Sequence, residues 1–257
     1  MSTGTDTVHE HHWEVSWAPL VISVGVTLLV PMAFTAYFVY EAPILAILFA
    51  GAGTPLVLAG VSKWIYEGAT QKMAISNIAD LGIGIFIVSE ILIFLSLFAS
   101  YWSMRIATGA AGDPWPPAGT PEIGLGLPGV MTVILVASSV TYHMGEQKFE
   151  AGDKGGFKLW LVVSIALGLL FFGCTAYEYA HLFEQEFVPG TNQFSTAFYS
   201  LTGFHAAHVL IGVLVFLVML YSVIRGPVHY MFVKSAGIYW HFVDVVWFFV
   251  ASQVYLW

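Results

Sequence analysis

Long, continuous apolar runs separated by short polar connections constrain this chain more than any other feature. Seven such runs occur, at residues 18–40, 44–65, 81–101, 125–142, 157–179, 196–223 and 235–256. Each run is close to the roughly 20 apolar residues that an α-helix needs to cross the hydrocarbon of a bilayer. None carries the polar face that a surface helix of a soluble protein needs. The runs therefore predict an all-α membrane protein with seven transmembrane helices.

The composition agrees with lipid as the main solvent. Of the 257 residues, 58% are hydrophobic and 9% are charged, whereas soluble domains have about 25% charged residues. This length accommodates one membrane domain, with a polar tail (1–17), a first helix pair (18–65) and five further helices (81–256). A single cysteine, Cys174, excludes an intramolecular disulfide and a multi-cysteine metal site.

The connections indicate how the helices group. The first two runs are joined only by Glu41, Ala42 and Pro43, which predicts a tight antiparallel hairpin because proline breaks the helical ladder. The next connection, residues 63–80, is longer and polar, which allows the first two helices to separate from the other five. Small residues four apart in the sixth run, Gly203 and Ala207, are expected to permit close helix approach.

The distribution of Lys and Arg predicts the orientation in the membrane. Seven of the eight Lys and Arg residues fall on the side of the N-terminus if the chain crosses seven times. They are Lys63, Lys72, Lys148, Lys154, Lys158, Arg225 and Lys234, and only Arg105 falls opposite. The positive-inside rule then places the N-terminus inside and the C-terminus, Trp257, outside.

The first 17 residues contain no Lys or Arg. They therefore lack the basic start of a cleavable signal or transit segment, and we interpret them as a retained tail. This interpretation favours a bacterial plasma membrane over the mitochondrial inner membrane.

Five ionisable residues fall deep within the apolar runs: Glu90, His205, His208, His241 and Asp244. A charged side chain at mid-membrane costs about 2.5–3.5 kcal/mol on insertion scales, so each needs a partner, a cavity or a function. Glu90 lies about 14 Å into its run at 1.5 Å per residue, and the same arithmetic brings His205, His208 and Asp244 near mid-depth. The pairs His205/His208 and His241/Asp244 are each three residues apart, so each pair shares a helix face. The spacing predicts a functional polar layer inside the bundle.

The role of this layer has two interpretations. We expect Glu90 to be hydrogen-bonded to one of the histidines or to be protonated, because removal from water penalises the ion. Structural stabilisation and direct proton handling both fit that state. Metal ligation by His205 and His208 is disfavoured, since a haem or copper site needs more ligands than lie nearby in sequence. At the outer end of the fifth run, Glu178 is expected to be a solvated or capping residue.

Several motifs resemble subunit III of the haem-copper oxidases. The most specific is YWHFVDVVW at residues 239–247, which is similar to the seventh-helix signature of that family. The sequence TGFHAAHV at residues 202–209 is similar to the sixth-helix motif, with Ala206 and Ala207 in place of a more usual glycine-containing pair. Ser89-Glu90 resembles the third-helix site of the family's carbodiimide-reactive carboxylate, and WPPAG at 115–119 resembles an outer loop.

The resemblance implies a fold and a role. The expected fold is a helix pair splayed in a V from a five-helix bundle, with phospholipid in the cleft. The expected role is that of a cofactor-free subunit of a proton-pumping cytochrome c oxidase, which reduces O2 in aerobic respiration. Such a subunit carries no haem or copper, lies against catalytic subunit I with subunit II in the same complex, and helps to sustain proton uptake and turnover.

Two residues are candidates for binding lipid headgroups on the inner side, Trp64 and Arg225. The guanidinium of arginine matches phosphate through two parallel hydrogen bonds. Both residues also fit as ordinary anchors at the membrane interface.

Other functions remain open from the sequence. The same fold serves equally as a subunit of a quinol oxidase or a nitric oxide reductase, because the electron-donor site belongs to another subunit. A stand-alone seven-helix transporter or receptor is less favoured, since the chain shows no inverted repeat. Nothing in the sequence indicates nucleic-acid binding.

Overall fold

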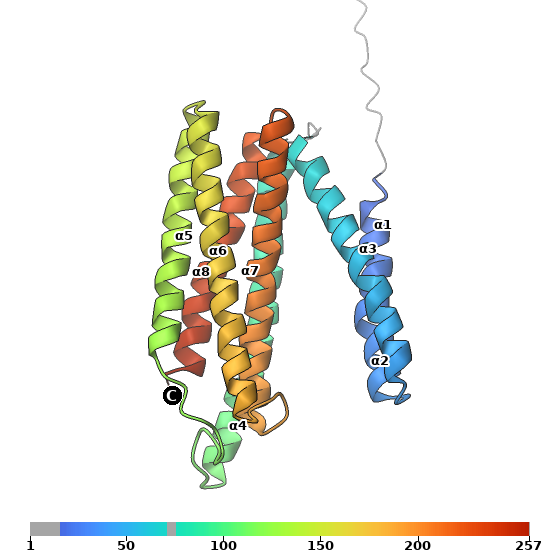
Figure 1. Ribbon diagram of the computed structural model, residues 1–257, viewed down its shortest axis with the longest axis vertical. Coiled ribbons are helices and arrows are strands. Elements are labelled where there is room, and N and C mark those ends of the chain that lie inside the picture. The colour runs from blue at the N-terminus through green and yellow to red at the C-terminus, as the bar shows by residue number, and fades with distance from the viewer. Residues whose placement is uncertain (1–15, 71–75, 257) are drawn as a thin grey trace, which may run out of the picture. The chain divides into compact units, whose positions relative to one another are not determined.

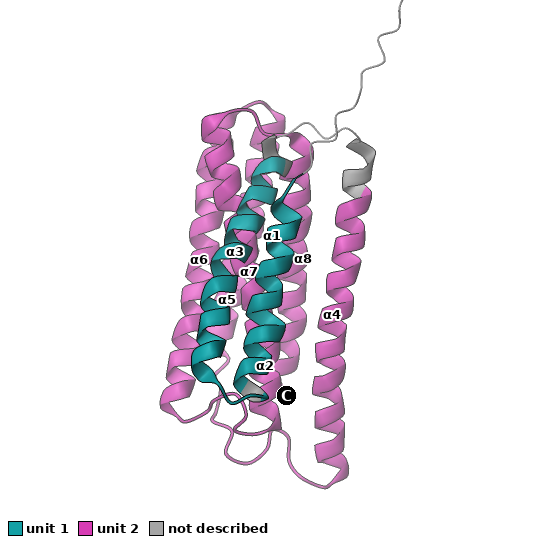
Figure 2. Cartoon of the chain, turned by 90° about the vertical axis from the view of Figure 1, so that its right-hand side faces the viewer, with its two compact units in different colours: residues 1–75 teal, residues 76–257 magenta. Residues whose placement is uncertain are grey.

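The computed structural model describes residues 16–70 and 76–256 (Figure 1). Most of the polar tail, Lys72 and the terminal Trp257 therefore lie outside the described residues. Within the described ranges all regular structure is helical. The chain divides into two compact units, Met1–Ile75 and Ser76–Trp257 (Figure 2). The division falls within the connection that the sequence identified.

The first unit is a helical hairpin. Its first rod comprises α1 (Ala18–Thr27), the π-helical segment η1 (Leu28–Met32) and α2 (Ala33–Phe38). Pro31 lies inside η1, and because proline donates no backbone hydrogen bond, the helical ladder is altered there. The second rod, α3 (Pro43–Thr70), begins at the predicted proline and packs along the first.

Glycines bring the two rods of the hairpin into backbone contact. A Cβ placed on Gly53 would lie 2.7 Å from the backbone nitrogen of Leu29, and one on Gly60 would lie 2.7 Å from Cγ1 of Ile22. In lipid, where the hydrophobic effect does not drive helices together, such close approach maximises van der Waals contact. The hairpin is therefore held by its small residues.

Polar contacts join the start of α1 to the last turns of α3. The Lys63 Nζ atom lies 2.6 Å from Glu67 Oε1, and Ser16 Oγ donates to Glu67 Oε2 at 2.6 Å. The Lys63 ammonium also lies 4.7 Å from the centre of the Trp17 ring. Helix α3 includes residues 63–70, which the sequence analysis assigned to a connection. That assignment is wrong because polarity marks the end of the hydrocarbon, not the end of the helix.

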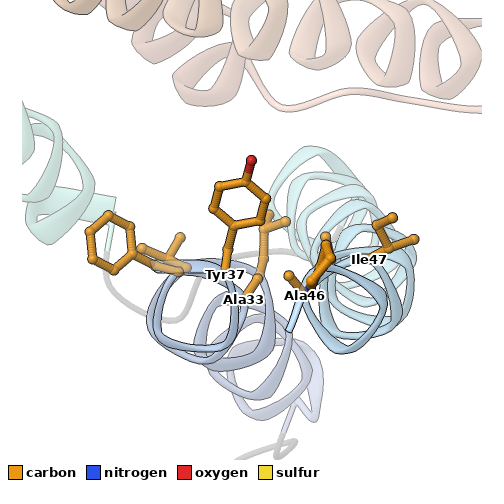
Figure 3. Close-up of a pocket in the computed structure, with 9 residues that line it drawn as sticks. Ala33, Tyr37, Ala46 and Ile47 are labelled. Carbon is orange, nitrogen blue, oxygen red and sulfur yellow. The ribbon is translucent and has the colours of Figure 1, made fainter. Parts of the chain in front are cut away.

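An apolar groove of about 460 Å³ lies on the hairpin near the π-helical segment. Figure 3 shows Ala33 and Tyr37 from the first rod beside Ala46 and Ile47 from the second. The groove therefore follows the line where the two rods meet.

The second unit contains five helices (Figure 1). They are α4 (Ser76–Ala110), α5 (Gly126–Glu150), α6 (Lys154–Glu184), α7 (Gln193–Arg225) and α8 (Tyr230–Val254). Helix α5 packs on α6 and α8, α7 packs on α6 and α8, and α4 packs on α7 and α8. Helices α7 and α8 thus each contact three others, so the side chains that they bury lie at the centre of the unit.

Side-chain caps define two helix starts in this unit. Asp153 precedes α6 and accepts from the Gly156 backbone N–H. Asn192 precedes α7 and forms a reciprocal capping box with Ser195. Each cap satisfies a backbone donor that has no partner within its helix.

Trp240 on α8 fills the space left by two glycines on neighbouring helices. A Cβ on Gly212 of α7 would lie 2.5 Å from the indole ring, and one on Gly168 of α6 would lie 3.1 Å from it. No helix of the described chain makes the predicted close approach at Gly203 and Ala207. A Cβ on Gly203 would make only an ordinary 3.4 Å contact, and Ala207 is exposed.

Six helical segments in the described residues are long and apolar enough to cross a membrane, so the chain is a multi-pass integral membrane protein. They are Ala18–Tyr37, Pro43–Glu67, Leu81–Ala110, Gly126–Glu150, Lys154–Glu184 and Gln193–Arg225. Helix α8 falls outside this group although it has 25 residues, because its polar side chains lower its mean hydropathy. If α1, η1 and α2 are taken as one helix and α8 is included, the number of helices agrees with the seven predicted runs.

Candidate functional site

Glu90 and His208 form a pair between α4 and α7. Glu90 Oε2 lies 3.0 Å from His208 Nε2, and the two side chains are 13% and 8% exposed. This is the kind of contact expected for Glu90 from the cost of a lone carboxylate in lipid. The pair connects two helices that are far apart in sequence.

The geometry around His208 determines the proton count of this pair. His208 Nδ1 lies 2.8 Å from the Phe204 backbone oxygen, and because a carbonyl oxygen only accepts, Nδ1 carries a proton. Nε2 therefore either accepts a hydrogen bond from protonated Glu90 or donates one to ionised Glu90. In both cases one proton lies between Glu90 and His208, and the pair has no net charge.

Aromatic rings enclose the His208 imidazole. The ring centres of Phe204 and Phe94 lie 4.7 Å and 5.1 Å from it. On α8, Tyr239 donates its hydroxyl to the His208 backbone oxygen at 3.0 Å. The pair therefore lies in an apolar environment with a fixed orientation.

A second polar cluster contains Ser139, His241 and Asp244. The Ser139 hydroxyl on α5 donates to Asp244 Oδ2 and lies 3.0 Å from His241 Nδ1. Asp244 is buried, as its position on the inward face of α8 predicts, whereas His241 is exposed. Ser139 is a site residue that sequence reasoning missed, because a serine in an apolar run usually only bonds its own helix backbone.

His205 lies apart from both clusters. Its side chain is fully buried, and neither ring nitrogen has a hydrogen-bond partner among the described residues. The rings of Phe171 and Trp247 lie beside it, with centres 5.7 Å and 5.1 Å away. The five ionisable residues thus form a pair, a serine-linked cluster and a separate imidazole, not one hydrogen-bonded layer.

The environment of Glu178 differs from the one expected from the sequence. Its side chain is buried in the last two turns of α6 and accepts a hydrogen bond from the Tyr255 hydroxyl at 2.7 Å. The expectation of a solvated or capping residue is wrong, because α6 continues to Glu184 and Tyr255 covers the carboxylate. The apolar residues after Glu178, including Leu182, are the sequence signal of this longer packed helix.

The two lipid-headgroup candidates lie in different units. Trp64 is 60% exposed on α3. Arg225 is the last residue of α7, is exposed, and places its guanidinium 5.3 Å from the Tyr221 ring centre. Both side chains are accessible, and their lipid binding stays a prediction.

No group of three or more His, Cys, Asp and Glu side chains lies close enough to hold a metal ion in the part of the chain that the structure describes. The chemistry that the polar side chains themselves offer is proton exchange and hydrogen bonding. The carboxyl and imidazole groups at Glu90, His208, His241 and Asp244 are suited to it.

The chain is similar to known proteins over nearly its whole length. A profile of the family described as cytochrome c oxidase subunit III matches residues 9–257. The cytochrome c oxidase subunit 3 of Synechocystis sp. is 42% identical over 180 residues, which cover 68% of this chain and 74% of the relative. The proteins of the same name from Thermostichus vulcanus and Allomyces macrogynus are 38% and 33% identical. The match to the Thermostichus protein covers 68% of this chain and 86% of the relative, and the match to the Allomyces protein covers 80% and 78%.

Proposed function

This chain belongs to the cytochrome c oxidase subunit III family and is a subunit of a haem-copper oxidase, and we propose that it is the cofactor-free accessory subunit of that complex. In this role it lies against catalytic subunit I, in a complex that also contains subunit II. It supports proton uptake and stability of the catalytic subunit and binds phospholipid. Haem and copper belong to the partner subunits.

The Glu90–His208 pair is the observation that carries this proposal. Movement of the shared proton from Oε2 to Nε2 converts a neutral pair into an ion pair, with no change in net charge. The local dipole changes, so the pair can respond to charge that moves in a neighbouring subunit. Its burial among aromatic rings strengthens such electrostatic effects, because the local dielectric is low.

Lipid binding is proposed at Arg225 and Trp64. Arg225 lies at the end of α7 that the positive-inside rule places at the inner surface, where phosphate headgroups are available to its guanidinium. Trp64 lies near the corresponding end of α3, and its exposed indole fits the interfacial zone.

The names of the relatives favour cytochrome c oxidase over a quinol oxidase or a nitric oxide reductase. They also disfavour a stand-alone transporter or receptor. Relatives from cyanobacteria and actinobacteria support a location in a bacterial plasma membrane. We expect the chain to purify with haem-containing partners in mild detergent, and migration alone without haem absorbance would contradict the proposal.

The test of the Glu90–His208 pair compares Glu90→Ala with Glu90→Gln in the purified oxidase. Glutamine keeps a hydrogen-bonding group beside His208 but cannot exchange a proton. We expect both variants to lower sustained turnover and proton uptake, because both remove the shared proton. If only Glu90→Ala impairs the enzyme, the pair has a structural role, and if neither variant changes initial rate, proton pumping or lifetime, Glu90 is a packing residue.

A further inference from the structure

The line of contact between α5 and α8 carries a row of polar side chains, which we name the α5–α8 seam. From α5 it contains Ser139, His143, Glu146 and Glu150, and from α8 it contains Tyr230, Lys234, His241 and Asp244. Apart from the step between Lys234 and His241, successive members are three or four residues apart, so each set lies on one helix face. Gly237 falls between Lys234 and His241 on the same face.

Contacts at both ends show that these two faces meet. At one end the Ser139 hydroxyl donates to Asp244 Oδ2. At the other end the Tyr230 hydroxyl donates to Glu150 Oε1 at 2.6 Å. Between the ends, Gly237 of α8 faces Tyr142 and Glu146 of α5, since a Cβ at the glycine would lie 2.9 Å from Tyr142 Cε1 and 3.7 Å from Glu146 Oε2.

The middle of the seam contains further hydrogen-bonding groups. His143 Nδ1 lies 3.8 Å from Glu146 Oε2, and Gln147 Nε2 lies 3.0 Å from His143 Nε2. The His143 side chain is 58% exposed and that of Glu146 is 17% exposed. The His143 imidazole is therefore accessible from outside the bundle, and towards the inner surface water molecules can join groups that do not touch directly.

The seam connects the inner surface with the middle of the membrane. Ser139 and Glu150 are separated by about 16 Å along α5 at 1.5 Å per residue, which is roughly half of the 30 Å hydrocarbon. Glu150 ends α5 and Tyr230 begins α8, both on the side that the Lys and Arg distribution places inside. The deep end of the seam is Asp244.

Asp244 has an unused hydrogen-bonding atom at this deep end. The residue is 7% exposed, and its Oδ1 atom has no partner in the described part of the chain. Because the single Ser139 hydroxyl proton points to Asp244, Ser139 Oγ accepts from His241 Nδ1. This leaves Nε2 of the exposed His241 ring available to exchange protons with the seam.

We propose that Asp244 is a proton-binding carboxyl group that exchanges with the inner aqueous phase along the α5–α8 seam. His241 takes a proton at Nε2 and releases its Nδ1 proton to Ser139 Oγ. Ser139 releases its own hydroxyl proton to Asp244 Oδ2. The imidazolium and carboxylate thereby become a neutral imidazole and a carboxylic acid, so protons and charge balance.

Among the ionisable groups around α8, Asp244 is the one that can accept a proton at the deep end of the seam. Glu90 and His208 are hydrogen-bonded to each other, and His205 lies against Trp247, three residues along α8 from Asp244. Within the seam, the charged groups nearer the surface are Glu146, Glu150 and Lys234. The site is separate from the Glu90–His208 pair, and its protonation does not depend on the role proposed for that pair.

The test uses infrared difference spectroscopy of the intact oxidase during steps from alkaline to mildly acidic pH. We expect the wild-type complex to gain a carboxylic-acid C=O band on acidification, and this band to be lost in the nearly isosteric Asp244→Asn variant. A band that persists in Asp244→Asn overturns the assignment to Asp244. Absence of any such band from the wild-type complex overturns the proposal as well.

Hydrogen–deuterium exchange of the same band tests the relay. Ser139→Ala keeps the carboxyl group but removes the bridging hydroxyl, and we expect exchange at Asp244 to slow by about tenfold or more. Glu178→Gln is the matched control, because it removes a buried carboxyl that is bonded to Tyr255 outside the seam, and it should leave the Asp244 band and its exchange unchanged. Unaltered exchange in Ser139→Ala contradicts the relay. This measurement does not require Asp244→Asn to assemble, and it is independent of turnover in the Glu90 variants.

Discussion

Three carboxyl groups of the five-helix unit each have a hydrogen-bond partner on another segment of the chain. Glu90 meets His208, Asp244 meets Ser139, and Glu178 meets Tyr255. A carboxyl group without such a partner pays a large desolvation penalty in an apolar environment. These residues therefore determine which helix faces can lie together, whatever chemistry they also perform.

A double-mutant cycle tests this view for Glu90 and His208. We expect His208→Ala to destabilise the protein by about 1–3 kcal/mol, because Glu90 is left buried without a partner. Adding Glu90→Leu removes the stranded carboxyl, so the double variant should lose less stability than the sum of the single variants. The measurement is denaturant-induced unfolding in detergent, followed by tryptophan fluorescence.

The control for this cycle is a pair of substitutions at sites that do not touch, such as His208→Ala with Glu178→Gln. Substitutions at such sites add to within roughly 0.5 kcal/mol. Additive effects for Glu90 and His208 would mean that their contact contributes nothing to stability.

At the scale of helices, the length of a helix and its close packing against a neighbour depend on different features of the sequence. Helix α4 has 35 residues and is about 52 Å long at 1.5 Å per residue, well beyond the 30 Å or so of hydrocarbon. The run 81–101 covers only part of this helix, whose apolar segment extends from Leu81 to Ala110. Close approach depends on single glycines instead, such as Gly53 in the hairpin and Gly212 against Trp240.

The hairpin offers a matched pair of glycine substitutions. Gly53→Ala places a methyl group 2.7 Å from backbone atoms of the first rod, whereas Gly51→Ala on the same helix meets nothing within 4 Å. We expect Gly53→Ala to destabilise the hairpin by about 1–3 kcal/mol through overpacking, and Gly51→Ala to be neutral or slightly stabilising.

Disulfide trapping measures this effect in a Cys174→Ser background. Cysteine pairs across the two rods of the hairpin should cross-link more slowly in Gly53→Ala than in Gly51→Ala. Equal cross-linking in the two variants would show that backbone contact at Gly53 is not what holds the rods together.

At the scale of the whole molecule, the arrangement of Lys and Arg predicts which connections lie on which side. In the same Cys174→Ser background, Lys154→Cys lies at the first residue of α6, next to the α5–α6 connection, and Asp113→Cys lies between α4 and α5. Both positions are exposed. We expect a membrane-impermeant maleimide to label Asp113→Cys in intact cells, and Lys154→Cys only after the membrane is opened. The reverse pattern would invert the topology and place the α5–α8 seam at the outer surface.

The sequence predicted the helices more reliably than the contacts between them. The runs at 44–65 and 157–179 located α3 and α6 but ended before the last turns of these helices, which continue to Thr70 and Glu184. They also did not reveal that Glu178 meets Tyr255. Of the polar residues, Asp244 is buried as predicted, while His241 on the same helix is exposed. A three-residue spacing spans about 60° of helix face by the geometry of 3.6 residues per turn, so one member of a pair can be buried while the other is not.

The sequence alone determined that the chain is helical, multi-pass and related to oxidase subunit III. A helix that crosses the hydrocarbon needs a stretch of consecutive apolar residues, so the number and order of such helices can be predicted from the sequence alone. Only the tertiary structure decided that Glu90 bonds to His208, that Ser139 bridges His241 and Asp244, and that His205 stands apart. Those partners lie about 100 residues apart or more along the chain, and they meet because of how each helix is rotated and packed against its neighbours.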